Sequence, residues 1–400
     1  MSKSTDPGHF FQTSDSLATS ARKSAKSENK NGNPISLPSK ILAIEYDATD
    51  AGAVYVAEAA GTARRVVLET GEKLAAYAGA NAPLTCIALS PPSTDGAERM
   101  LFAGCWDKTI HSWSLKSRKP IRRFTGHTDF VKCVTVVTIS GQLVLISGSS
   151  DATIIIWDIA TGKKLHTLKG HARGILDVAI DPASSTKDEI VLFSADSVKD
   201  IRRWRVSLAA AGELPDEPIR AHETSVNKLR FEEPVAADED DADADADLWT
   251  ASSDNTAQHL VRSRNWAADT TLQHPDFVRD IVVDQDAGWV ITACRDEEVR
   301  VWNGSTGDLT CVFDGHYEEV TGLALLPGAD GQRANRVVSV SIDATVRTWS
   351  LDAAEIKKFK EEAERRAQGV EDQPKEEVKE SMLTMEEEAE LAELMDSDDE

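Results

Sequence analysis

The chain has 400 residues, a formal net charge of −24 and a hydrophobic content of 41%. No apolar run reaches the roughly 18 residues of a membrane span, and the polar N-terminus lacks the apolar stretch of a secretory signal. We therefore expect an intracellular protein, in the nucleus, the cytoplasm or both, with no membrane contact. The five cysteines include no Cys-x-x-Cys pair, so we expect reduced packing residues and neither metal nor cofactor.

Most of the negative charge lies in two segments. Residues 371–400 contribute −12 and residues 238–247 contribute −7, which leaves −5 for the rest of the chain. The charge thus belongs to attachments rather than to the folded body. Direct nucleic-acid binding is not expected, whereas a protein partner with a basic surface is.

Residues 1–40 are rich in Ser, Lys, Asn and Pro, a composition typical of mostly disordered segments. The segment also contains spaced basic residues. They are interpreted either as a nuclear-import or phosphate-contacting patch or, as we favour, as part of a solvated linker; they are Arg22, Lys23, Lys26 and Lys30.

A repeat begins at Ile41. Its clearest unit, residues 143–159, has two apolar, β-branched runs on either side of a Ser-Gly-Ser-Ser-Asp turn, the composition of a buried hairpin. Tryptophans recur along the chain at spacings of 44, 47, 98 and 47, and Leu260 stands in the long gap. An aspartate stands six residues before most of these positions, and a histidine lies further upstream. Both recur with the same period. Three markers therefore predict a repeated sheet unit.

The sequence Gly-His, then Ser-Gly-Ser-x-Asp, then Trp-Asp, at a period in the forties, resembles the WD40 repeat family, whose fold is a β-propeller. Residues 41–351, divided by seven, give about 44 residues per unit, which matches the 40 to 45 of one four-stranded blade. We predict an all-β, seven-bladed propeller over residues 41–351, monomeric within a larger complex. A disordered N-terminal segment and a helical, acidic C-terminal tail flank it.

The last repeat ends after its third strand near Leu351, so its outer strand is missing. The resemblance implies that an N-terminal segment supplies it. The candidates within residues 1–40 are residues 8–12 and residues 34–38.

Recurring polar residues are predicted to form one hydrogen-bond chain in each blade, from histidine through serine and aspartate to the tryptophan ring N–H. The same residue types form hydrolase triads, but their repetition favours a structural role, and no catalytic residue is assigned. Ser147 or Ser149, and Ser339 or Ser341, remain alternatives. The predicted sets are His127, Asp151 and Trp157; His171, Ser194, Asp196 and Trp204; His274, Asp296 and Trp302; and His316, Asp343 and Trp349.

Alternating strands place two sets of loops on opposite rims. The histidine rim holds the loops that contain these histidines and the turns that contain the aspartates. Aromatic and basic residues there are predicted to bind partners, since such residues dominate interface energetics; the alternative is loop packing and solvation. These candidates are Trp106, Phe130, Lys132, Arg173, Phe277, Arg279 and Arg295.

The insertion rim, on the opposite side, holds the longer insertions, including the acidic residues 232–247. This insertion is interpreted either as a solvated loop or as an electrostatic site for a basic partner. Calcium is disfavoured, because the glycine and terminal glutamate of an EF-hand are missing.

Two segments follow the repeats. Residues 352–369 favour a helix that leans on the propeller through Ile356 and Phe359, or projects from it. Residues 370–400 form an acidic tail in which Thr384 and Glu387 make a capping box. This short helix is expected to bind a partner, the alternative being a solubilising tail; its apolar face comprises Leu391, Leu394 and Met395, and Ser397 is a phosphorylation candidate.

We interpret the chain as a non-catalytic scaffold or adaptor in a nuclear, chromatin-type, ribosomal or RNA-processing complex. One alternative is a substrate receptor of a ubiquitin ligase, although Trp157-Asp158 is followed by Ile159-Ala160 rather than the x-Arg of a Trp-Asp-x-Arg box. Another is a hydrolase-type propeller, or a non-catalytic subunit of an enzyme that modifies RNA or a translation factor.

Overall fold

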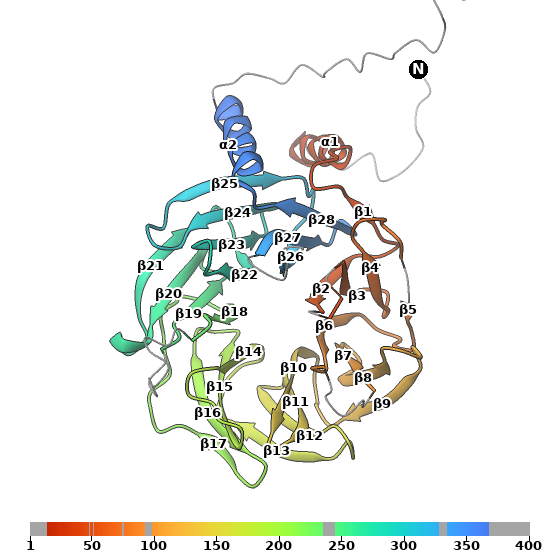
Figure 1. Cartoon of the computed structure of the whole chain (residues 1–400), viewed down its shortest axis with the longest axis vertical. Helices are drawn as coiled ribbons and strands as arrows, with labels where there is room; N and C mark the ends of the chain where they lie inside the picture. Colours follow the sequence, from red (N-terminus) through yellow and green to blue (C-terminus); the bar gives the residue numbers. More distant parts are fainter. Residues whose placement is uncertain are drawn as a thin grey trace, which may run out of the picture. The chain divides into compact units, whose positions relative to one another are not determined.

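Seven four-stranded antiparallel sheets form a closed ring (Figure 1). The structure is a computed structural model that describes residues 14–47, 49–50, 52–73, 76–92, 98–234, 245–327 and 334–367. The first strand of each sheet contacts the first strand of the next, and the ring ends with β26 (Val320–Pro327) beside β2 (Ile41–Tyr46). The predicted all-β, seven-bladed propeller is therefore confirmed.

Blades 1 to 6 each consist of four consecutive strands. They are blade 1, with β2, β3 (Ala53–Glu58), β4 (Ala63–Val67) and β5 (Ala76–Tyr77); blade 2, with β6 (Leu84–Leu89), β7 (Met100–Cys105), β8 (Thr109–Ser114) and β9 (Pro120–Thr125); blade 3, with β10 (Val131–Ile139), β11 (Gln142–Ser149), β12 (Thr153–Asp158) and β13 (Lys164–Lys169); blade 4, with β14 (Ile175–Asp181), β15 (Glu189–Asp196), β16 (Ile201–Ser207) and β17 (Ala211–Glu213); blade 5, with β18 (Val226–Phe231), β19 (Leu248–Ser252), β20 (Thr256–Val261) and β21 (Ala267–Gln273), with the 3-10 helix η2 (Arg262–Arg264) between the last two; and blade 6, with β22 (Val278–Asp284), β23 (Trp289–Cys294), β24 (Glu298–Asn303) and β25 (Leu309–Asp314).

The core lies between neighbouring blades rather than at one centre. The middle strands are buried on both faces, which explains the unbroken apolar runs at residues 143–146 of β11 and 154–157 of β12. An outer strand such as β9 buries only Phe124 and exposes its other residues. Each blade therefore depends on its two neighbours to cover its apolar side chains.

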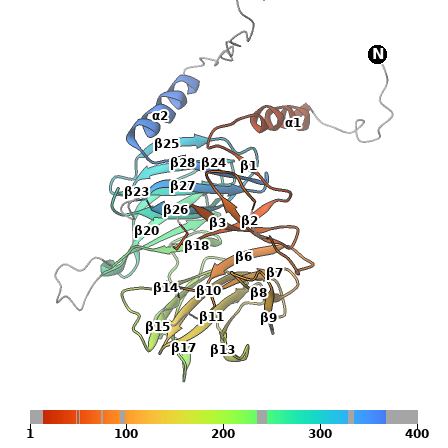
Figure 2. The ribbon, with the colours of Figure 1, turned by 45° about the vertical axis from the view of Figure 1, so that its right-hand side comes forward.

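Blade 7 is completed from both ends of the propeller sequence. It contains β26, β27 (Ala334–Ser341), β28 (Thr345–Ser350) and β1 (Ile35–Ser36), in the order β1-β28-β27-β26. β1 pairs antiparallel with β28, and both lie near the top of the ring in Figure 2. Of the two candidate segments, residues 34–38 contain this strand, and residues 8–12 lie outside the described residues.

The residues before β1 include a helix, α1 (Ser14–Ser27), where we expected mostly disordered chain. Its basic side chains bind carboxylates: Lys26 Nζ lies 3.1 Å from Glu297 and 3.0 Å from Asp314. Arg22 lies 2.9 Å from the same Glu297. Composition did not indicate the helix, because the carboxylates that hold it are some 270 residues away in the sequence.

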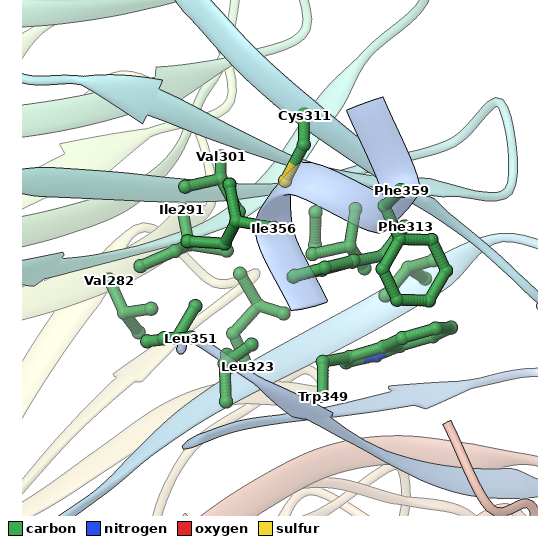
Figure 3. Close-up of a cluster of buried hydrophobic side chains, with 14 residues drawn as sticks. Val282, Ile291, Val301, Cys311, Phe313, Leu323, Trp349, Leu351, Ile356 and Phe359 are labelled. Carbon is green, nitrogen blue, oxygen red and sulfur yellow. The ribbon is translucent and has the colours of Figure 1, made fainter. Parts of the chain in front are cut away.

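The C-terminal helix α2 (Ala353–Ala367) begins directly after blade 7. Ile356 and Phe359 are buried in the cluster between blades 6 and 7, where Phe359 packs edge-on against Phe313 and Trp349 (Figure 3). Of the two alternatives for this helix, the start of α2 adopts the one in which it leans on the propeller. In the described parts of the chain, no helix is long and apolar enough to cross a membrane.

The closing strand supplies the first test. Leu37, just after β1, is buried with Ile41, Val340 and Val346. Replacing it with alanine should lower the free energy of unfolding by about 2 to 5 kcal/mol, the usual cost of truncating a buried leucine to alanine. Urea unfolding followed by tryptophan fluorescence measures this. Leu309→Ala, at a position that is 46% exposed on β25, is the control and should change stability by less than about 0.5 kcal/mol. Equal effects would contradict the closure.

Candidate interaction surface

The polar chain of blade 3 joins two strands, a loop and a turn. Trp157 Nε1 donates to Ser147 Oγ at 2.8 Å, and Ser147 Oγ lies 2.8 Å from His127 Nε2. His127 Nδ1 lies 3.0 Å from Asp151, whose carboxylate can only accept. Ser147 is therefore the serine of this set. Ser149 Oγ instead donates to the backbone oxygen of Asp129.

The same connections recur in other blades. In blade 7 the serine is Ser339 rather than Ser341, and in blade 5 Thr250 takes the serine position beside His222 and Asp254. The two sets that match blade 3 fully are His171, Ser194, Asp196 and Trp204, and His316, Ser339, Asp343 and Trp349.

Blade 6 departs from the prediction at Asp296. His274 Nε2 contacts Thr292 Oγ1, which also accepts from Trp302, but His274 Nδ1 donates to the backbone oxygen of Leu272. Asp296 instead pairs with Arg300, at 2.6 Å. A guanidinium is a charged, bidentate donor and takes the carboxylate that a neutral imidazole would otherwise hold. Burial and the charge of Arg300 lower the pKa of His274 to about 4, so this ring is neutral at pH 7.

The serines of these sets are inaccessible. Ser147, Ser194 and Ser339 are completely buried, and each accepts a hydrogen bond from a tryptophan ring. A nucleophile needs an open approach for its substrate and a free site for the oxyanion. These side chains therefore hold the blades in place and cannot serve as hydrolase triads.

An exposed aromatic pair lies on the histidine rim between blades 2 and 3. Trp106 and Phe130 are 43% and 36% exposed, and their rings stack with centroids 5.2 Å apart and planes 20° apart. Backbone hydrogen bonds hold both loops: Trp106 N donates to Pro83 O, and Ser150 N donates to Phe130 O. Two large rings thus present a fixed apolar surface to solvent.

The other predicted rim residues do not form one patch with this pair. Arg295 lies over the Phe277 ring at 5.1 Å, within blade 6, and Arg173 is an exposed side chain of blade 4. Arg279 pairs with Glu319, and like Lys132 it lines the central channel. The tail residues Leu391, Leu394, Met395 and Ser397 lie outside the described residues.

Known proteins share this repeat and, in one case, nearly the whole sequence. The family described as WD40, the WD domain, G-beta repeat, matches residues 71–114, 118–158, 268–303 and 307–350. An uncharacterized WD repeat-containing protein of Schizosaccharomyces pombe is 33% identical over 395 residues, which are 98% of each chain. This chain belongs to the WD-repeat family.

Shorter similarities accompany this full-length one. The tRNA (guanine-N(7)-)-methyltransferase non-catalytic subunit wuho of Drosophila mojavensis is 42% identical over 80 residues, which are 20% of each chain. The human WD repeat-containing protein 97 is 35% identical over 81 residues, covering 20% of this chain and 5% of that protein.

The sequence did not point to the bonds that join blades of this WD-repeat protein around its channel. Asp177 on β14 accepts from Leu229 N in the next blade, and Asp280 on β22 accepts from Leu323 N, both at 2.9 Å. Thr321 Oγ1 donates to Ile41 O across the closure of the ring. Both aspartates stand two residues after the first buried residue of their strand, and this shared position is the sequence signal for these bonds.

All seven first strands line a central cavity of about 580 Å³. Burial raises the pKa of Glu45 there to about 7, against the opposing charges of Arg230 and Lys228. Burial also raises the pKa of Cys86 to about 12, so this thiol stays protonated and is a poor nucleophile. The described part of the channel therefore presents charged side chains, and the Cys86 thiol there is not activated as a nucleophile.

The hydrogen-bond chain of blade 3 makes stability depend on pH. Burial opposes ionisation of Asp151, but hydrogen bonds from His127, Thr153 and the Thr128 N–H outweigh it and hold its pKa well below the usual range. A carboxylate with a lowered native pKa stabilises the fold above its unfolded pKa of about 4, and loses that contribution as the pH falls towards the native value.

Asp151→Asn should therefore cost about 1 to 3 kcal/mol at pH 7, and the difference from the natural chain should narrow below about pH 4. Urea midpoints between pH 7 and pH 3 measure it. Asp308→Asn, at an exposed aspartate, is the control and should show no such gap. A gap that is constant with pH would contradict the assignment.

Proposed function

We propose that this WD-repeat protein is a non-catalytic adaptor that binds partner proteins through its histidine rim, with the Trp106 and Phe130 pair as the main contact. The exposed, stacked pair carries the proposal. Tryptophan is among the residues that most often dominate interface energetics, and a side chain already held in place loses little entropy on binding. Arg173 and Arg295 are further candidate contacts on the same rim.

Several observations support an adaptor rather than an enzyme. The side chains of the repeated Ser, His and Asp sets already hydrogen-bond to one another, and their serines are buried. The wuho protein of Drosophila mojavensis, similar over a fifth of this chain, is named as a non-catalytic subunit. That name favours a second candidate function, in which this chain is a non-catalytic subunit of an RNA-modifying enzyme.

The partner is proposed to present a basic surface. Residues 238–247 and 371–400 carry most of the net negative charge, and opposite charge speeds association and selects partners. Such a partner fits a nuclear, chromatin-type, ribosomal or RNA-processing complex, within the nucleus or the cytoplasm. Direct nucleic-acid binding is not part of the proposal.

Trp106→Ala tests the rim. Quantitative affinity purification of the full chain from its own cells should show at least a tenfold loss of rim-dependent partners, corresponding to about 1.4 kcal/mol or more. Leu309→Ala, which removes a side chain of similar exposure from an outer strand, should retain them. Thermal unfolding confirms that both variants fold. Unchanged recovery with Trp106→Ala and with Phe130→Ala would refute the rim contact.

A chain that ends at Gly369 tests the acidic tail separately. We propose that Leu391, Leu394 and Met395 form the apolar face of a helix that docks into a partner, with Ser397 as a phosphorylation site. Partners bound by the tail should disappear with the truncation. The triple change of these three residues to serine is the matched variant, since it keeps every charge, and it should lose the same partners. Partners that the triple variant retains would bind through the charge of the tail rather than through this apolar face. Retention of every partner by the truncated chain would leave the tail a purely solubilising segment.

A further inference from the structure

Three possible metal ligands meet at the base of the acidic insertion. Glu232 follows β18, Asp247 precedes β19, and His259 lies on β20. Glu232 N donates to Asp247 O at 3.0 Å, so the two ends of the insertion are adjacent. The three residues thus come from separate segments of blade 5.

The spacing of their donor atoms suits a shared ion. His259 Nε2 lies 3.6 Å from Glu232 Oε1 and 3.6 Å from Asp247 Oδ2. These distances are too long for direct hydrogen bonds. Two donors that are each about 2.1 Å from a tetrahedral zinc ion lie about 3.4 Å from one another. The three donor atoms all fall within 4.8 Å of each other.

The imidazole gives an independent indication. His259 Nε2 is buried and has no hydrogen-bond partner among the described residues. A buried nitrogen that is left unsatisfied is costly, and such groups are uncommon in folded proteins. The ring of Trp249 packs on the imidazole with centroids 4.7 Å apart, which fixes its orientation. The nitrogen therefore faces both carboxylates at ion-pair distance, 3.6 Å from each, without a direct hydrogen bond to either.

Both carboxylates are oriented by outer donors. Asp247 Oδ1 accepts from Arg262 N at 2.7 Å, which leaves Oδ2 towards the imidazole. Glu232 Oε1 accepts from Trp249 Nε1 at 2.8 Å, and its second oxygen lies 3.5 Å from Gln285 Nε2. A carboxylate oxygen has a second lone pair for a metal, and metal ligands are usually held in this way by an outer shell of hydrogen bonds.

A second cluster of similar composition shows the contrast. In blade 2, Cys105, Asp107 and His111 also lie within 4.8 Å of one another. There, however, His111 Nε2 bonds to Asp107 at 2.9 Å, and the Cys105 thiol donates to Ala82 O. Burial raises the pKa of that thiol to about 11. Those groups are already satisfied, and they carry no proposal.

We propose that Glu232, Asp247 and His259 bind a zinc ion. One imidazole and two carboxylates suit Zn²⁺ better than Mg²⁺ or Ca²⁺, which prefer oxygen ligands alone. Three protein ligands leave a fourth position for water. The bound ion would join the two ends of the acidic insertion and offset the two carboxylate charges at its base. The sequence did not suggest the site, since no recognised ligand spacing links the three residues.

The test uses the full chain, stripped with a chelator and titrated with Zn²⁺ in competition with a chromogenic indicator. The natural chain should bind one equivalent that His259→Gln and Asp247→Asn bind at least tenfold more weakly. Asp286→Asn, an exposed acid of the same rim, is the control and should bind normally. Zn²⁺ should raise the unfolding temperature of the natural chain and the control, but not of the two ligand variants.

Two results would overturn the proposal. Equal affinity in the natural chain and both ligand variants would assign any bound zinc to the acidic surface at large. Absence of binding by a natural chain that unfolds cooperatively would reduce the cluster to a histidine beside two carboxylates. Unfolding curves recorded in chelator show whether each ligand variant is folded. If His259→Gln does not fold, Asp247→Asn decides the matter, because it keeps an acceptor for Arg262 N.

Discussion

The closure of the ring by β1 is the constraint on which the rest of the propeller depends. Every blade covers the faces of its neighbours, so a gap at one position would expose two apolar faces and an unpaired strand edge. The N-terminal segment prevents this with more than the two residues of β1. Arg347, completely buried on β28, donates to the backbone oxygens of Asn29 and Asn31, and Thr348 N donates to Gly32 O.

The blades keep one geometry although their polar residues differ. Where the full His, Ser, Asp and Trp set is missing, other pairs satisfy the buried polar groups of the blade. In blade 2 Trp113 Nε1 donates to Ala78 O, and in blade 1 Arg64 pairs with Glu58 at 2.7 Å. The requirement is that buried polar groups be paired, and the identity of the partner is secondary. This explains how degenerate repeats fit a regular ring.

The features that recur from blade to blade could be predicted from the sequence, whereas contacts that occur in one place only could not. The period, the tryptophans and the histidines pointed to seven blades because each was seen several times. The pairing of Asp296 with Arg300 was missed because blades 4 and 7 also have an arginine at this position, Arg202 and Arg347, and there the turn aspartate still bonds to the histidine. Helix α1 and the Glu232, Asp247 and His259 cluster were missed for a different reason: their partners meet only after folding, and no local pattern records such distances.

The dependence of blade 7 on β1 also bears on how the protein is made. The ribosome produces β1 before any blade, yet its partner β28 is nearly the last strand to emerge. Throughout synthesis the nascent chain carries an N-terminal segment that has no edge to pair with. A messenger truncated before the codons of β28 would yield a polypeptide with open apolar faces at both ends, a natural target for chaperones and proteases.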